Sequence, residues 1–200
     1  MPYPAGHSAE VKGKIIESAR RLFNRHGFDN VSLDQIMSGA GLTRGGFYNH
    51  FNSKSDLYTE VLGCFFTDPT WKNQWDGVEI DMTSESLAPQ VVRAYLSRQH
   101  FENVENSCPM VALPTDVTRS SQAARSAFEN VFHAMVGLLE RDVVASRSDS
   151  HNRAQAIAAL CIGGMIVARA MSSRAAADDL RGGCMSVALA LGGWQNDREL

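Results

Sequence analysis

The residues of this chain that could do specific chemistry lie between positions 43 and 54. This short stretch brings together two cations, an aromatic hydroxyl, two aliphatic hydroxyls, two amides and an imidazole, with two glycines among them. The candidate binding residues are Thr43, Arg44, Gly45, Gly46, Tyr48, Asn49, His50 and Lys54. Hydrogen-bonding side chains on one face of a short helix can enter the major groove of DNA. The stretch therefore predicts a DNA-binding segment.

Local start and stop signals predict the helices that would position this segment. Ser32 and Gln35 have the spacing of a capping box, which starts a short helix. Gly41 should break that helix, and Thr43 can cap the next one. Ser53, with an aspartate three residues later, can start a further helix through residue 67. Two short helices around a glycine turn are thus predicted, followed by a longer helix.

The two adjacent glycines favour contact with a bulky partner. Gly45 and Gly46 lie in the first turn of a predicted helix, where each costs roughly 1 kcal/mol relative to alanine. Because glycine has no Cβ, a large partner can approach the backbone closely there. An ordinary, well-capped helical hairpin is the alternative, since helix-turn-helix geometry also occurs in proteins that never meet DNA.

A longer run around these residues resembles the DNA-binding domain of TetR-family transcriptional regulators. The resemblance covers about residues 10 to 62, and residues 108 to 119 are similar to the sixth-helix region of some members. Two positions depart from the family pattern: Met37 stands where many relatives have alanine, and Gly46 replaces the more usual serine or threonine. The run reads Asp34-Gln-Ile-Met-Ser-Gly-Ala-Gly41-Leu-Thr43-Arg44-Gly-Gly-Phe47-Tyr48-Asn-His50-Phe51-x-Ser-Lys54-x-x-Leu57.

The resemblance implies a role for individual side chains. Thr43 would cap the recognition helix and bind a phosphate, and Arg44 would reach a base edge, with guanine preferred. Tyr48 and His50 would bind backbone phosphates, and Lys54 would add a charge-assisted phosphate contact. From the residues alone, a half-buried Tyr48 and a solvated His50 are the alternatives. Phe47 and Phe51 are core residues in either interpretation.

Hydrophobic periodicity predicts an all-α fold. After a loose arm at residues 1–7, apolar residues recur at helical spacing from Val11 to Phe23, and Gly27 should end that helix. Pro109 suits a first helical turn. Further helices are expected over 87 to about 104, 121 to about 145, 153 to 174 and 177 to 191, with a break at 148–152, for about nine helices in all.

With the resemblance, this pattern implies two domains. An N-terminal three-helix helix-turn-helix domain would span residues 8–53, and a helical effector-binding and dimerisation domain would span residues 54–194. The last two helices are rich in alanine and glycine, which suits the close approach of helices in a two-fold four-helix interface. A buried hairpin within one subunit is the alternative. A homodimer is preferred because a reader of palindromic DNA needs two copies.

An effector pocket could draw on aromatic and methionine side chains of the middle of the chain. The candidates are Trp71, Trp75, Phe101, Met110, Phe128, Phe132 and Met135, each of which could equally be plain core. Charged anchors are sparse among them, so we expect a small, largely apolar effector.

Cysteine usage and charge exclude several classes. Four widely spaced cysteines without a CxxC pair indicate neither a disulfide framework nor a zinc site. A net charge of −3 is unsuited to non-specific DNA packing. Cys108, before a proline at an expected helix start, could make the chain a redox- or electrophile-sensing repressor, or it could be a small buried hydrophobe.

The sequence therefore predicts a dimeric, sequence-specific repressor that a small apolar effector releases from a palindromic double-stranded DNA operator. An all-helical enzyme is a less favoured class, because no nucleophile–base spacing, phosphate loop or metal motif appears. We expect no cofactor and no metal. We see no signal peptide, and small and polar residues interrupt the most apolar stretch, 154–171. A cytoplasmic protein without a membrane span is expected.

Overall fold

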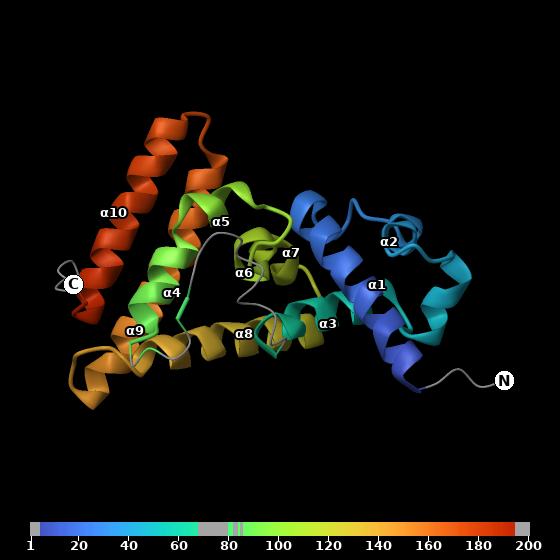
Figure 1. Cartoon of the computed structure of the whole chain (residues 1–200), viewed down its shortest axis with the longest axis horizontal. Helices are drawn as coiled ribbons and strands as arrows, with labels where there is room; N and C mark the ends of the chain where they lie inside the picture. Colours follow the sequence, from blue (N-terminus) through green and yellow to red (C-terminus); the bar gives the residue numbers. More distant parts are fainter. Residues whose placement is uncertain (1–4, 68–79, 82–83, 85, 195–200) are drawn as a thin grey trace. The chain divides into compact units, whose positions relative to one another are not determined.

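The computed structural model describes residues 5–67, 80–81, 84 and 86–194, and the regular elements of these residues are all helical (Figure 1). The predicted all-α class is therefore confirmed. The chain forms two compact units. The first unit contains residues 1–68 and 104–131, and the second contains residues 69–103 and 132–200. The predicted functional domains, divided at residue 53, remain a prediction.

Helix α1 (Ala5–His26) forms one wall of the first unit. Ile15, Ala19 and Phe23 recur every fourth residue and are fully buried. The helix ends at Gly27, whose φ is +76° and whose N–H donates to the Phe23 carbonyl at 2.8 Å, as predicted. The predicted loose arm is wrong from Ala5 onward, because a glycine at position 6 costs too little to stop a helix that has a long buried face.

Two short elements and a longer helix follow in the first unit, and they begin where the sequence predicts. Ser32 and Gln35 form the capping box: the Gln35 N–H donates to Ser32 Oγ at 3.2 Å, and the Ser32 N–H donates to Gln35 Oε1 at 2.8 Å. Gly41 has a φ of +71° and ends this segment. The Asp56 N–H donates to Ser53 Oγ at 3.0 Å. The elements are α2 (Leu33–Gly39), the 3-10 helix η1 (Arg44–Asn49) and α3 (Lys54–Thr67).

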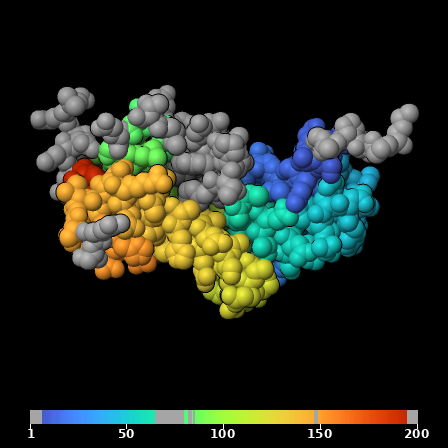
Figure 2. All heavy atoms as spheres, turned by 90° about the horizontal axis from the view of Figure 1, so that it is seen from below, coloured from blue at the N-terminus to red at the C-terminus, as the bar shows by residue number. Residues whose placement is uncertain are grey.

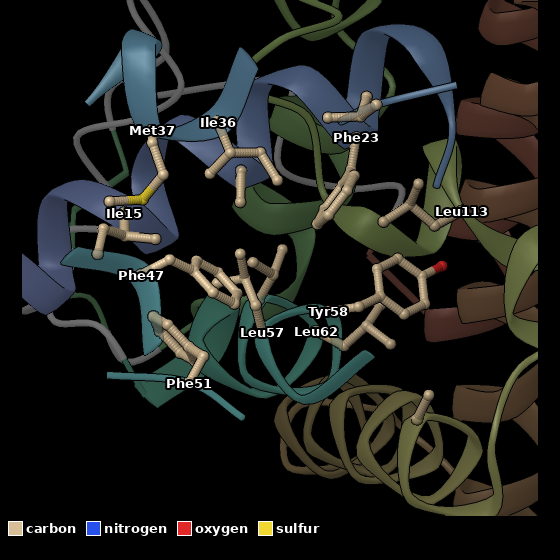
Figure 3. Packing of buried hydrophobic residues seen from close by; sticks show 14 of the residues in the cluster. Ile15, Phe23, Ile36, Met37, Phe47, Phe51, Leu57, Tyr58, Leu62 and Leu113 are labelled. Carbon is tan, nitrogen blue, oxygen red and sulfur yellow. The ribbon is translucent and has the colours of Figure 1, made fainter. Parts of the chain in front are cut away.

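A later stretch of the chain completes the first unit. It contains α6 (Pro109–Ala112), α7 (Pro114–Thr118) and the start of α8 (Gln122–Glu140), and a proline opens each of the two short helices. The Asp116 carboxylate accepts the Phe28 N–H at 2.8 Å. Figure 3 shows how side chains from these elements meet in one core. That core includes Ile15, Phe23, Ile36, Met37, Phe47, Phe51, Leu57, Tyr58, Leu62 and Leu113.

The second unit is built on a helical hairpin. Helix α9 (Arg147–Ala170) packs along α10 (Arg174–Gly192), and α10 also contacts α4 (Ala88–Tyr95). The short α5 (Arg98–Glu102) and the end of α8 belong to the same unit. The buried Arg181 guanidinium donates to the Leu96 carbonyl at 2.7 Å. Helix α9 is long and apolar enough to cross a membrane, but a core helix meets the same criterion, and α9 is packed against α10.

Three helix boundaries of the second unit differ from those expected. The last two helices, expected over 153–174 and 177–191, are divided earlier: α9 ends at Ala170 and α10 begins at Arg174, because Ser173 is the N-cap whose Oγ accepts the Ala176 N–H at 3.3 Å. The single helix expected over 87–104 is two helices, because Ser97 acts as a new N-cap whose Oγ accepts the His100 N–H at 3.2 Å. The break expected at 148–152 lies earlier, between Glu140 and Arg147, where α8 ends and α9 begins. Residues of this break bind other elements: Asp142 Oδ2 accepts the N–H of Ala88 at 2.8 Å.

Candidate DNA-binding surface

The segment that carries the predicted DNA contacts is the 3-10 helix η1. Phe47 is fully buried and anchors it, and the Phe51 ring stacks on Phe47 with centroids 5.6 Å apart. Both phenylalanines are core residues, as predicted. Tyr48 lies edge-on to Phe47 at 5.3 Å, with 61% of its surface exposed. The half-buried interpretation of Tyr48 is therefore wrong, and its hydroxyl is available to a partner.

The other predicted contact residues share this side of the first unit. Gly46, His50 and Lys54 are half-buried, and the remaining ones are exposed. Figure 2 shows the cyan stretch of the chain, around η1, at the molecular surface. We call the exposed residues Thr43, Arg44, Gly45, Tyr48 and Asn49 the reading face. It combines hydrogen-bonding side chains with a backbone that Gly45 leaves open, since a Cβ there would meet nothing within 4 Å.

Thr43 occupies the predicted N-cap position but does not cap with its side chain. Its backbone is extended, with φ −86° and ψ 150°, and its hydroxyl makes no capping hydrogen bond. Instead, the Thr43 carbonyl accepts the Gly46 N–H at 3.1 Å, which closes the tight 3-10 turn. The predicted side-chain cap is thus wrong, whereas the predicted phosphate contact of this hydroxyl stays a prediction.

Arg44 has an intramolecular partner that was not predicted from the sequence. Its Nη1 donates to Asp34 Oδ2 of α2 at 2.9 Å. The two side chains are 60% and 62% exposed, so the pair contributes at most about 1 kcal/mol. A guanidinium held so weakly can exchange Asp34 for a base edge. The sequence does place an acidic residue, Asp34, in the first turn of the preceding helix. Whether its side chain contacts Arg44 depends on the conformation of the turn between the two helices.

Lys54 is held against the turn between α1 and α2. Its Nζ lies 4.2 Å from the centroid of the Phe28 ring, a cation–π contact. Desolvation lowers the pKa of Lys54, and the nearby carboxylates of Asp29 and Asp116 oppose that effect. A phosphate would therefore have to compete with Phe28 and these carboxylates for the ammonium group.

The two departures from the family pattern are neighbours in space. A Cβ on Gly46 would lie 3.8 Å from the Met37 Cε, so a larger residue at 37 faces a smaller one at 46. A cavity of about 290 Å³ lies beside them. It is lined by His7, Ser8, Val11, Met37, Leu42, Thr43, Gly46, Asn49 and His50.

The residues predicted to bind an effector fall in different parts of the chain. Trp71 and Trp75 lie outside the described residues. Met110 and Phe128 belong to the first unit, and Met110 is fully buried. In the second unit, Met135 is buried, and Phe101 and Phe132 are half-buried. A pocket that these residues share stays a prediction.

Cys108 is fully buried at the N-cap of the four-residue helix α6. Reactive thiols are usually partly exposed and close to positive charge, so burial favours the interpretation of Cys108 as a small hydrophobe. Within the described residues, no three histidine, cysteine or acidic side chains gather as a metal ion would require.

Comparison with known proteins identifies the family. The profile of "Bacterial regulatory proteins, tetR family" matches residues 15–61, from within α1 to within α3. The "Uncharacterized HTH-type transcriptional regulator TtgW" of Pseudomonas putida is 32% identical over 94 residues, which are 43% of this chain and 70% of TtgW. The chain belongs to the TetR family.

Further relatives of this TetR-family regulator match mainly in the N-terminal part. The "Biofilm operon icaADBC HTH-type negative transcriptional regulator IcaR" of Staphylococcus aureus is 36% identical over 56 residues, 28% of this chain and 30% of IcaR. The chain spans less than half the length of several curated relatives that it matches. The reduced form of Escherichia coli NemR has a TM-score of 0.71 at 17% identity, covers 90% of this chain, and is itself covered to 95%. That likeness shows the fold.

Proposed function

We propose that this TetR-family regulator is a sequence-specific repressor that reads a palindromic operator through the reading face. The observation that carries the proposal is the arrangement of η1: Phe47 is buried beneath, while Arg44 and Tyr48 are exposed above. Arg44 would bind a base edge and Tyr48 a phosphate, so that one contact specifies and the other positions. Repression is supported by the name of IcaR, a negative regulator.

We further propose that the chain acts as a homodimer through α9 and α10. These helices expose small and apolar side chains that water does not favour, among them Val167 and Val187 at 50% and 51% exposure. Glycines on the same helices leave room for a close partner: a Cβ on Gly163 or Gly183 would meet nothing within 4 Å. A second copy of this hairpin would bury both valines and complete a four-helix interface.

Release by a small, largely apolar effector completes the proposal. Phe128, Phe132 and Met135 recur along α8 and keep their proposed role in binding it. Such a ligand releases DNA only if it binds the DNA-free arrangement better than the DNA-bound one, since equal affinity for both shifts nothing. In this proposal the chain works in the cytoplasm, without catalysis and without a membrane span.

The test of DNA binding is direct. A binding site is selected from random double-stranded DNA with the full chain, and its affinity is then compared with that of a scrambled duplex by fluorescence anisotropy at several salt concentrations. We expect a palindromic site, preferred by about 10³-fold or more, and an affinity that falls with salt. Equal affinity for both duplexes, or selection of no common site, would contradict the proposal.

A further inference from the structure

A second cavity opens at the surface of the first unit, lined by residues other than those of the reading face. Its volume is about 250 Å³. The turn between α1 and α2, helix α3, and the segment from α7 to the start of α8 line it, and all of them belong to the first unit. It is lined by Phe28, Asp29, Ser55, Tyr58, Asp116, Arg119, Ser120, Ser121 and Ala124.

Tyr58 brings an unsatisfied hydroxyl to this cavity. The residue is 1% exposed, and its ring packs against Phe23 and Phe28 with centroids 5.4 and 4.7 Å apart. No described residue meets the geometry of a hydrogen bond with this hydroxyl, although the Ser120 hydroxyl is close enough to influence it. In Figure 3 its oxygen points away from Phe47 and Phe51. Buried hydroxyls nearly always have a partner, so this one calls for a group that can occupy the cavity.

The two carboxylates at the cavity differ in their partners. Asp116 has partners within the fold, because its Oδ2 accepts the Phe28 N–H at 2.8 Å and its Oδ1 pairs with Arg119 at 3.2 Å. Asp29 is exposed at the rim and makes no ion pair within the described part of the chain, although Lys54 is close enough to feel its charge.

The two carboxylates also act on Tyr58. Burial, and then Asp116 and Asp29, raise the pKa of the Tyr58 phenol, while Ser120 acts in the opposite direction. The phenol end of Tyr58 therefore lies among the polar residues that line the cavity, and it stays protonated. Its oxygen can accept a hydrogen bond from a cationic donor, and its proton can be donated in turn.

We propose that this cavity is a binding site for a small organic cation. Its ammonium group would donate hydrogen bonds to the Tyr58 oxygen and to the Asp29 carboxylate, and its apolar body would pack on Phe28 and Ala124. The volume limits the ligand to less than drug size. Ser55 and Tyr58 follow Lys54 on α3, so the bound cation lies about one helical turn from a proposed phosphate contact.

Three probes of one size and different charge test the site on the full chain without DNA. These are benzylamine, which is a cation at neutral pH, benzyl alcohol and benzoate, with Kd measured by titration calorimetry or ligand-observed NMR. We expect benzylamine to bind most tightly. Tyr58→Phe and Asp29→Asn should each weaken its binding about tenfold. Tyr58→Phe should lower the thermal stability little, because the hydroxyl has no well-formed hydrogen bond to lose.

Asp179→Asn is the matched control, because Asp179 is an exposed carboxylate on α10 in the second unit. It should leave the Kd unchanged. The proposal is overturned by equal binding of the three probes, by no binding at millimolar concentration, or by unchanged Kd in both variants. A crystal structure that shows ordered water alone beside Tyr58 in the presence of benzylamine overturns it as well. Because no arm contains DNA, failure of operator binding would leave this result unaffected.

Discussion

The reading face of η1 and the exposed face of the α9–α10 hairpin offer a partner opposite chemistry. The reading face presents hydrogen-bonding groups over a buried anchor, Phe47. The hairpin face presents Val167, Gly183 and Val187, which offer shape and apolar surface but no hydrogen-bonding side chain. Directional polar groups can distinguish one base pair from another. Small apolar side chains are instead stabilised by burial against another closely packed apolar surface, and this contact is not directional. The first face therefore suits recognition, and the second suits assembly.

The largest expected effect comes from charging the hairpin face. Gly183→Arg should produce a folded monomer, because the site is open in one chain and arginine is a better helix former than glycine. Losing the second reading face should weaken operator binding by about 10²–10⁴-fold. Sedimentation at micromolar concentration and anisotropy with operator DNA measure the two effects.

A matched control variant is available on α8, and one other glycine of the hairpin is unsuitable for this test. Gly137→Arg, on an exposed and equally open site of α8, should leave the dimer intact. Gly164→Arg is unsuitable, because a Cβ on Gly164 would lie 2.8 Å from Cys184 Sγ, within the same chain. If Gly183→Arg still sediments as a dimer and binds operator normally, the hairpin face is not the interface.

Gly163 and Gly164 show why the two faces were not equally predictable from sequence. Both belong to a stripe of small residues, but Gly164 packs against α10 and Gly163 faces open space. Which of two neighbours turns inward depends on how α9 and α10 pack, and periodicity of small residues does not contain that information. The sequence therefore predicted a close helix contact, but not which residues make it within the chain.

The reading face was more predictable because its signals are local. The capping box of Ser32, the helix break at Gly41 and the buried Phe47 each depend on a few adjacent residues, and all were expected from them. The contacts that were missed bridge elements. The Arg44–Asp34 pair crosses the turn, and the stacking of Lys54 on Phe28 joins α3 to the end of α1.

Arg44→Ala tests whether the reading face recognises sequence. A good base contact provides about 1–3 kcal/mol of discrimination, so the preference for operator over a single-base variant should fall by about ten- to a hundredfold. The dimer should remain folded, because the ion pair with Asp34 is exposed. Asp34→Asn is the companion variant: it frees the guanidinium and should leave the order of site preference unchanged. An Arg44→Ala protein with the same relative affinities would show that Arg44 does not read a base.

Mild acid should destabilise the second unit more than the first. Desolvation lowers the pKa of His100 to about 4, Arg169 adds to this, and the hydrogen bond to the Tyr95 carbonyl opposes it. Its folded pKa is below the unfolded value of 6.5, so stability is lost as pH falls from 6.5 towards 4. At pH 5 the loss is about 2 kcal/mol.

Hydrogen exchange at pH 7.5 and pH 5 locates that loss. Amides of α4 and α5 in the second unit should lose protection, whereas those of α1 and α2 should change less. Glu10 and Glu17 of α1 have lowered pKa values, so their contribution is lost only at more acidic pH, below about 4.5. His100→Gln should remove the difference between the units in this pH range. Equal loss in both units of the unaltered chain would show that His100 is not its source.

The smallest expected effects concern the phosphate contacts that flank Arg44. Tyr48→Phe and Lys54→Ala should each weaken binding several-fold for all DNA sequences alike, since phosphates carry no sequence information. For Lys54→Ala, the slope of log K against log salt should also fall by about one.

The structure makes the Lys54 result the more informative, because its Nζ already lies over Phe28 and its pKa is lowered by desolvation. If Lys54 keeps that position on DNA, the salt slope will match that of the control Arg98→Ala, an exposed cation on α5, and only the stability will fall, by about 1 kcal/mol. That outcome would assign Lys54 to holding α3 against the turn after α1, and leave phosphate binding on this side to Tyr48 and His50.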